Sequence, residues 1–248
     1  MTATHSSRLH WLDPRQPDQA FPDPAFALPD PNGLLAIGGD LSPTRLLNAY
    51  RQGIFPWFNP DEPILWWSPD PRCVFVPGTV HISRSLAQRI RRGGYALSFD
   101  LAFAETLAAC ASVRRSDRGS WLGAEMQAAY CSLHRNSMAH SVEIWREGQL
   151  IGGLYGVAIG RMFFGESMFS AETDASKLAL VHLSQQLLAW GFPLLDCQVA
   201  SPHLLRLGAH NLPRADFLAQ SQQAQQLTPP ARWHFDRAHA GDVRHLPI

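Results

Sequence analysis

The segment that most constrains the fold lies between residues 53 and 72 and reads GIFPWFNPDEPILWWSPDPR. It contains three tryptophans, two phenylalanines and five prolines. Because proline fixes φ and lacks an amide donor, this composition predicts a rigid, irregular loop rather than a helix or strand. Flat rings on a stiff loop can bind another flat group, and nucleobases are the commonest such ligand. The rings could instead fill a core between two small layers, and composition alone favours that interpretation.

The overall composition is that of a globular protein. Hydrophobic residues make up 46% of the chain and charged residues 17%, with a formal net charge of zero. Any anionic partner must therefore be bound by local clusters of arginine. The four cysteines are widely spaced, and neither they nor the histidines have a metal-ligand spacing. No apolar run approaches the roughly 20 residues that span a bilayer, so we expect a soluble cytoplasmic protein without membrane contact.

The N-terminal half predicts a small domain followed by helices. Ser42 and Pro43 are typical of a helix start, and that helix should end before Gly53. A domain boundary is expected near residue 70, which divides the chain into domains 1–70 and 71–248. Further helices are expected from a Ser83 cap, from an Asp100 cap and around residues 126–133.

The C-terminal half changes to strand patterns. Strands are expected over 140–145, within 149–169 and over 193–200, with a long helix over 174–190 before the last strand. A short helix should follow over 201–207, and the last thirty residues should form a peripheral tail. This α/β (α+β) order is similar to that of the N-acetyltransferase-like (GNAT-like) acyltransferase fold.

An acid and an amide stand out in the apolar strand expected over 193–200. Asp196 and Gln198 are two residues apart, so they should point to the same face of the sheet. A carboxylate in such a strand is costly to bury unless it is hydrogen-bonded or faces a cleft. The residues alone leave open whether Asp196 is structural or functional.

Arginines cluster on the helix expected after Ser83. Arg84, Arg89, Arg91 and Arg92 lie there, and no acidic residue occurs between His81 and Phe99. Such a run is often only a solvated face. Four arginines on one short helix repel one another, and this repulsion is easier to understand if the phosphates of a nucleic acid offset it.

Several motifs resemble those of the bacterial leucyl/phenylalanyl-tRNA–protein transferases. They are the segment 32–72, Gly165-Glu166-Ser167, the Asp-x-Gln pair at 196 and 198, and Gly119-Ser120-Trp121 in place of Gly-Thr-Trp. The resemblance covers roughly residues 20–220. Leu122-Gly123 departs from the Ile-Thr expected in the family, which puts the start of the following helix in doubt.

The resemblance implies a reaction and its partners. Leu or Phe, and also Met, would move from aminoacyl-tRNA to the α-amino group of proteins that begin with Arg or Lys, which marks them for degradation by the N-degron route. The partners would be the 3′ end and acceptor region of the tRNA and the acceptor protein. No cofactor or metal is expected, because the ester donor is already activated, and the protein should be a monomer.

The resemblance also suggests roles for individual residues, in four groups. The catalytic group is Asp196, Gln198 and Glu166; the rings that stack on the terminal adenosine are Trp57 and Trp121; the aminoacyl pocket comprises Leu154, Phe163, Leu180 and Leu183; the tRNA phosphates meet Arg84, Arg89, Arg91 and Arg92. Asp196 could be a general base or a positioning group. Leu183 stands where some relatives have Phe, so the pocket shape should differ somewhat.

Two alternatives belong to other functional classes. An acyl-CoA-dependent N-acyltransferase would need a glycine-containing pyrophosphate loop before its central helix, but the chain has MFSAETDAS there. A non-catalytic RNA-binding module would explain the rings and arginines, but not an acid in a central strand.

Overall fold

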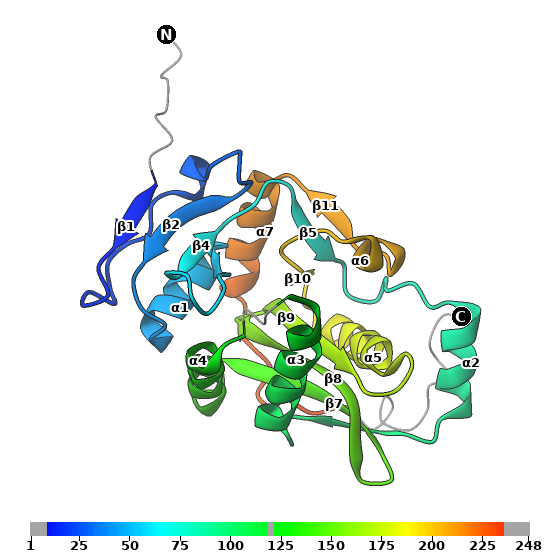
Figure 1. Cartoon of the computed structure of the whole chain (residues 1–248). Coiled ribbons are helices and arrows are strands. Elements are labelled where there is room, and N and C mark those ends of the chain that lie inside the picture. Colours follow the sequence, from blue (N-terminus) through cyan, green and yellow to red (C-terminus); the bar gives the residue numbers. More distant parts are fainter. Residues whose placement is uncertain (1–8, 119–121, 236–248) are drawn as a thin grey trace.

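The computed structural model describes residues 9–118 and 122–235 and contains two β-sheets (Figure 1). The smaller sheet is built from residues 10–67, and the larger one begins with the strand at Arg72. The α/β class expected from the sequence is confirmed. The division into domains at residue 70 stays a prediction.

The N-terminal sheet has the strand order β1-β2-β4-β3. Its elements are β1 (His10–Leu12), a 3-10 helix η1 (Pro24–Phe26), β2 (Leu34–Gly38), α1 (Pro43–Arg51), β3 (Phe55–Pro56) and β4 (Leu65–Trp67). The expectation of a wholly irregular segment over 53–72 was therefore wrong, since β3 and β4 pair as antiparallel strands within it. Proline is tolerated here because β3 is an edge strand.

The large sheet has seven strands in the order β11-β5-β10-β9-β8-β7-β6. Their bounds are β5 (Arg72–Phe75), β6 (Ala96–Phe99), β7 (Ala139–Arg146), β8 (Gln149–Ile159), β9 (Met162–Ser170), β10 (Leu194–Asp196) and β11 (His210–Leu212). Neighbouring strands are antiparallel except β9 and β10, which are parallel and are connected through α5 (Ala175–Ala189). This meander, helix and parallel strand follow the order that the sequence predicts.

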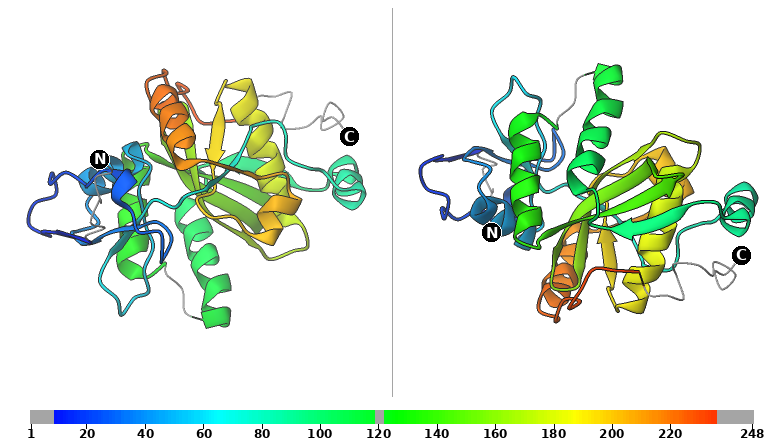
Figure 2. Two further views of the ribbon diagram at one scale, coloured as in Figure 1. Left: turned by 90° about the horizontal axis from the view of Figure 1, so that it is seen from above. Right: turned by 90° about the horizontal axis from the view of Figure 1, so that it is seen from below.

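Helices cover both faces of the large sheet. On one face α3 (Phe103–Arg118), α4 (Ala124–Arg135) and the N-terminal unit share a core that includes Tyr50, Tyr130 and Phe164. On the other face α5 and α2 (Arg84–Arg92) enclose a second core that includes Phe163 and Leu183. Figures 1 and 2 show α2 at the end of the molecule opposite to the N-terminal sheet.

The part of the predicted C-terminal tail that the structure describes, residues 219–235, packs against the rest of the protein, and residues 236–248 lie outside the described residues. After α6 (Pro202–Arg206) and β11, α7 (Arg214–Gln225) packs against the N-terminal unit, and its Phe217 is completely buried. Trp233 and Phe235 then pack against the core beneath α5. Glutamine and proline content indicated a solvated end, but a few large apolar residues are enough to fix this segment.

Of the three helix caps predicted from the sequence, two are confirmed by the structure. The Ser42 and Ser83 side chains accept hydrogen bonds from the amides of Arg45 and Leu86, so both predicted caps are confirmed. The Asp100 cap was wrong, because α3 begins at Phe103 and the Asp100 carboxylate instead accepts the amide of Ser141. No helix within residues 9–118 and 122–235 is long and apolar enough to cross a lipid bilayer.

Candidate active site

A cavity of about 320 Å³ opens on the α5 face of the large sheet, where β9 and β10 meet the N-terminal unit. Its walls come from β3, β8, β9, α5, the segment after β10, and α6. All four residues predicted for the aminoacyl pocket line it: Leu154, Phe163, Leu180 and Leu183. Each of these side chains is at most 5% exposed, so the cavity can enclose an apolar group of amino-acid size.

Glu166 lies at the polar side of this cavity and is positioned by a β-bulge. Tyr155 pairs with Ser167 and Gly156 pairs with Gly165, so Glu166 is the extra residue on β9. With Glu166 ionised, the Tyr50 hydroxyl donates to Glu166 Oε1 at 2.8 Å and the Tyr130 hydroxyl donates to Glu166 Oε2 at 2.6 Å. A protonated Glu166 instead donates to one of the two hydroxyls. The two hydroxyl oxygens are themselves 2.8 Å apart, so the three side chains form a closed ring of hydrogen-bonding groups.

The number of protons in this ring favours a neutral Glu166. Three contacts need three protons, but two tyrosine hydroxyls supply only two when Glu166 is ionised. Burial raises the pKa of Glu166 from 4.5 to about 7, and the hydrogen bonds from Tyr130 and Tyr50 oppose only part of that change. The pKa of each tyrosine is raised well above 10, first by burial and then by the charge of Glu166. Glu166 therefore changes its charge near neutral pH.

Gln198 extends the polar side of the cavity. Its Nε2 lies 3.4 Å from Glu166 Oε1, and its backbone amide donates to Asp196 Oδ1 at 3.0 Å. The expectation that Asp196 and Gln198 share a sheet face through strand alternation was wrong. β10 ends at Asp196, and Gln198 has a left-handed φ of 57°, which turns it out of the strand.

Asp196 is separated from the cavity by its own partners. Its carboxylate is 0% exposed and accepts from Arg72 Nε at 2.8 Å and Arg72 Nη2 at 2.7 Å. Arg72 also donates through Nη1 to the carbonyl of Gly53 at 3.0 Å, and its guanidinium lies over the ring of Phe217. Such a bidentate buried pair holds the Gln198 turn in place, and Asp196 does not line the cavity.

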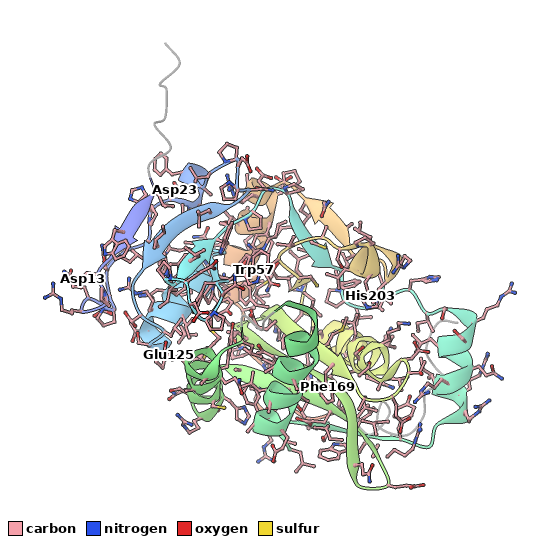
Figure 3. The ribbon with its side chains drawn as sticks, in the orientation of Figure 1. Asp13, Asp23, Trp57, Glu125, Phe169 and His203 are labelled. Carbon is pink, nitrogen blue, oxygen red and sulfur yellow. The ribbon has the colours of Figure 1, made fainter. Side chains whose placement is uncertain are left out.

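The tryptophans of the segment 53–72 divide between core and cavity. Trp66 is completely buried and donates to the carbonyl of Gly38, as the core interpretation expects. Trp57 is 46% exposed and lines the cavity rim, and Trp67 donates to its carbonyl. Figure 3 shows Trp57 on the side of the N-terminal unit and His203 at α6. Trp121, the second ring predicted to stack, lies outside the described residues.

The positive charge of the arginine helix α2 is partly compensated by an acidic residue. Arg84, Arg91 and Arg92 are exposed on α2, as predicted. Arg89 instead lies 3.0 Å from Glu172, which also pairs with Arg146, so the expected lack of compensation was wrong for this residue. Glu172 follows β9 and is distant in sequence, and a local charge count could not find it.

Three site residues were missed by sequence reasoning. Tyr50 lies within the N-terminal motif, where its signal was a tyrosine on the apolar face of a predicted helix. Tyr130 lies on the predicted helix over 126–133, where its spacing from Met126 and Leu133 indicated only helical periodicity. Arg72 follows a proline-rich loop, and nothing local distinguishes it from a surface arginine.

Comparisons with known proteins identify the family of this chain. Residues 74–222 match the family model "Leucyl/phenylalanyl-tRNA protein transferase", and residues 39–70 match the model of its N-terminal domain. A leucyl/phenylalanyl-tRNA–protein transferase of Alkalilimnicola ehrlichii is 56% identical over 93% of this chain and 90% of its own length. One of Thiobacillus denitrificans is 58% identical over 87% of this chain and 95% of its own length.

Solved structures resemble this chain less closely than the sequence relatives do. A GCN5-related N-acetyltransferase from Kribbella flavida is 13% identical, covers 68% of this chain and 60% of its own, and has a TM-score of 0.32. The sequence matches, in contrast, extend over both sheets and over every cavity wall. The chain belongs to the leucyl/phenylalanyl-tRNA protein transferase family.

Proposed function

We propose that the protein transfers Leu, Phe or Met from aminoacyl-tRNA to the α-amino group of proteins that begin with Arg or Lys. The observation that carries this proposal is one cavity in which an apolar pocket ends beside Glu166 and Gln198, with Trp57 at its rim. The apolar part fits the donor side chain. The polar part fits the ester and the incoming amine.

The donor would be bound at its 3′ end. Its side chain would enter the pocket of Leu154, Phe163, Leu180 and Leu183, and its terminal adenosine would stack on Trp57, with Trp121 as a second proposed ring. Exposed arginines on α2 would bind phosphates of the acceptor region. Arg89, which is less exposed on the same helix, would contribute less, because Glu172 already neutralises it.

Glu166 would act as the base and then return the proton. In its ionised form it accepts a proton from the acceptor α-ammonium group, and the free amine attacks the ester carbonyl. The C–N bond forms and the C–O bond to the ribose breaks; the leaving oxygen takes the proton held by Glu166, and the second proton that the nitrogen loses on forming the amide passes to solvent. A pKa of about 7 suits both steps, because the group gives and takes protons near neutral pH.

Gln198 and Asp196 would orient the reactants. The Gln198 amide lies beside Glu166 in the cavity wall and can hydrogen-bond the ester or the amine. Asp196 is assigned a positioning role through Arg72 and the Gln198 amide, because its carboxylate is buried and accepts hydrogen bonds from both. Ionised Glu166 would also attract the cationic side chain of the acceptor.

The proposed substrates also suggest where the protein acts and which process it serves. We assign the protein to the cytoplasm, where charged tRNA is made, and to the marking of proteins for degradation by the N-degron route. We also propose that it acts as a monomer. Sedimentation velocity at micromolar concentration should give a single species near 27.6 kDa.

One assay tests the proposed reaction. The protein is incubated with radiolabelled Phe-tRNA and a casein fragment that begins with Arg, and label should enter the polypeptide. The same fragment beginning with Glu is the control for acceptor choice. Acetyl transfer from acetyl-CoA without aminoacyl transfer would favour the N-acyltransferase alternative, and tRNA binding without either reaction would favour an RNA-binding module.

A further inference from the structure

The C-terminal segment reaches the back of the aminoacyl pocket. After α7, the carbonyl of Thr228 accepts a hydrogen bond from Arg161 Nε at 2.9 Å, which fixes the segment at the turn between β8 and β9. Trp233 then packs against the rings of Phe99, Trp190 and Phe192, with centroid distances of 5.7, 5.1 and 6.1 Å. Trp233 is therefore packed, partly buried, against the core beneath α5.

Trp233 contacts one pocket residue directly. Its ring centroid lies 5.8 Å from that of Phe163, which lines the cavity, whereas Trp233 itself does not. Phe163 also packs closely against the backbone of Gly156 in the sheet. A Cβ at position 156 would lie only 2.5 Å from Phe163 Cε1, so the ring fits there because residue 156 is glycine. Phe163 thus rests on the backbone of Gly156, lines the cavity, and contacts Trp233, which lies outside the cavity lining.

His140 holds Trp233 in this position. The two rings stack with centroids 3.8 Å apart and an interplanar angle of 11°. His140 Nδ1 donates to Asp100 Oδ2 at 2.7 Å, and Asp100 Oδ1 accepts the amide of Ser141 at 2.8 Å. This chain of contacts fixes the imidazole plane, and the imidazole plane fixes the indole.

We infer that Trp233 is a specificity-determining residue, which sets the depth of the aminoacyl pocket by supporting Phe163 from behind. The inference rests on the proposed function and deepens it. A closely packed wall resists displacement, so a donor side chain longer than phenylalanine is excluded. Without the indole, Phe163 can move back and the pocket becomes deeper.

The test uses one tRNA charged in turn with phenylalanine, leucine or the bulkier 4-iodophenylalanine, and a peptide that begins with Arg. Two donors compete in the same tube, so their transfer ratio does not depend on how much of the enzyme is active. Trp233→Ala should raise the ratio of 4-iodophenylalanine to phenylalanine about tenfold, as expected for one misfitted group in an apolar pocket. Wild-type enzyme that transfers no amino acid at all would refute the proposed function instead.

Phe235→Ala is the matched control. Phe235 lies two residues further along the same segment and stacks on Phe99 with centroids 4.2 Å apart. Its truncation should loosen the segment and leave the transfer ratio near that of the wild type. An unchanged ratio in Trp233→Ala, or equal changes in both variants, would overturn the inference.

A double variant tests whether the effect acts through Phe163. Leucine at position 163 lacks the ring that rests on the indole. Adding Trp233→Ala to Phe163→Leu should therefore change the ratio by less than about twofold, since residues in contact are not additive. A full tenfold change in the Phe163→Leu background would mean that Trp233 acts by another route.

Discussion

Replacing Glu166 by glutamine should change how the stability of the protein depends on pH. In the folded protein the pKa of Glu166 is about 7, whereas an exposed glutamate has a value of 4.5. Between these two pH values the folded state keeps the proton and the unfolded state releases it. The contribution of Glu166 to the free energy of unfolding therefore falls as pH rises through this window.

The size of this effect follows from the pKa difference. At about 1.4 kcal/mol per pH unit, a pKa of about 7 in place of 4.5 corresponds to about 3.5 kcal/mol as an upper value. Glu166 is partly exposed to the cavity, so we expect between about 1 and 3 kcal/mol. Glutamine can donate to Tyr130 and accept from Tyr50, so it mimics the neutral acid in the ring at every pH.

Thermal unfolding measured between pH 5 and pH 8.5 provides the assay. Glu166→Gln should be closest to the wild type near pH 5 and exceed it most at pH 8.5, by about 2–4 °C for each kcal/mol. Glu147→Gln, in the exposed turn between β7 and β8, is the control and should follow the wild type throughout. A constant difference between Glu166→Gln and wild type across this range would refute the assignment of Glu166 as the protonated member of the ring.

The same variant should be inactive while it is more stable. Loss of a general base lowers rates by about 10²–10⁴-fold, and single-turnover transfer from Phe-tRNA measures this directly. A stable and active Glu166→Gln protein would contradict the proposed base. A stability gain with loss of activity would identify Glu166 as a group kept for chemistry at a cost to folding.

The other substitutions should separate positioning, stacking and phosphate contacts. Asp196→Asn leaves a buried Arg72 without its charge partner, so the free energy of unfolding should fall by about 3–5 kcal/mol in urea titrations; an unchanged midpoint would contradict the ion pair. Trp57→Ala should raise the donor KM by about one to two powers of ten with unchanged circular dichroism, and an unaltered KM would leave this ring without a role in binding. Arg91→Ala with Arg92→Ala should flatten the salt dependence of tRNA binding by about two in slope, and an equal slope would mean that α2 is only a solvated face.

The apolar pocket could be predicted because each of its residues lies on an element that the sequence identifies locally. Leu180 and Leu183 are three residues apart on a long helix, and Leu154 and Phe163 lie on neighbouring strands. These four residues come together once the order of strands and helices along the chain is known. That order can be read from the strand and helix periodicity of the sequence. The family resemblance then gave the pocket a substrate.

The polar side of the site could not be predicted from local patterns. The contacts of Glu166 with Tyr50 and Tyr130 join residues 116 and 36 positions apart. They depend on a β-bulge that strand alternation does not reveal, and the left-handed turn at Gln198 likewise breaks the period-two rule. Local rules failed where the backbone departs from regular geometry, and these departures lie at the site itself.

The buried position of Arg72 has a consequence for the order in which the protein can be made. Arg72 leaves the ribosome 124 residues before Asp196 does, which at about 5–20 residues per second is a delay of about 6–25 seconds. Throughout that time its guanidinium has no carboxylate partner and stays in water, so the N-terminal unit cannot dock on the strands that follow. The cavity requires that docking, since Trp57 and the Gln198 turn are brought together by it. A chain still attached to the ribosome should therefore leave the surrounding charged tRNAs untouched until synthesis has passed residue 198.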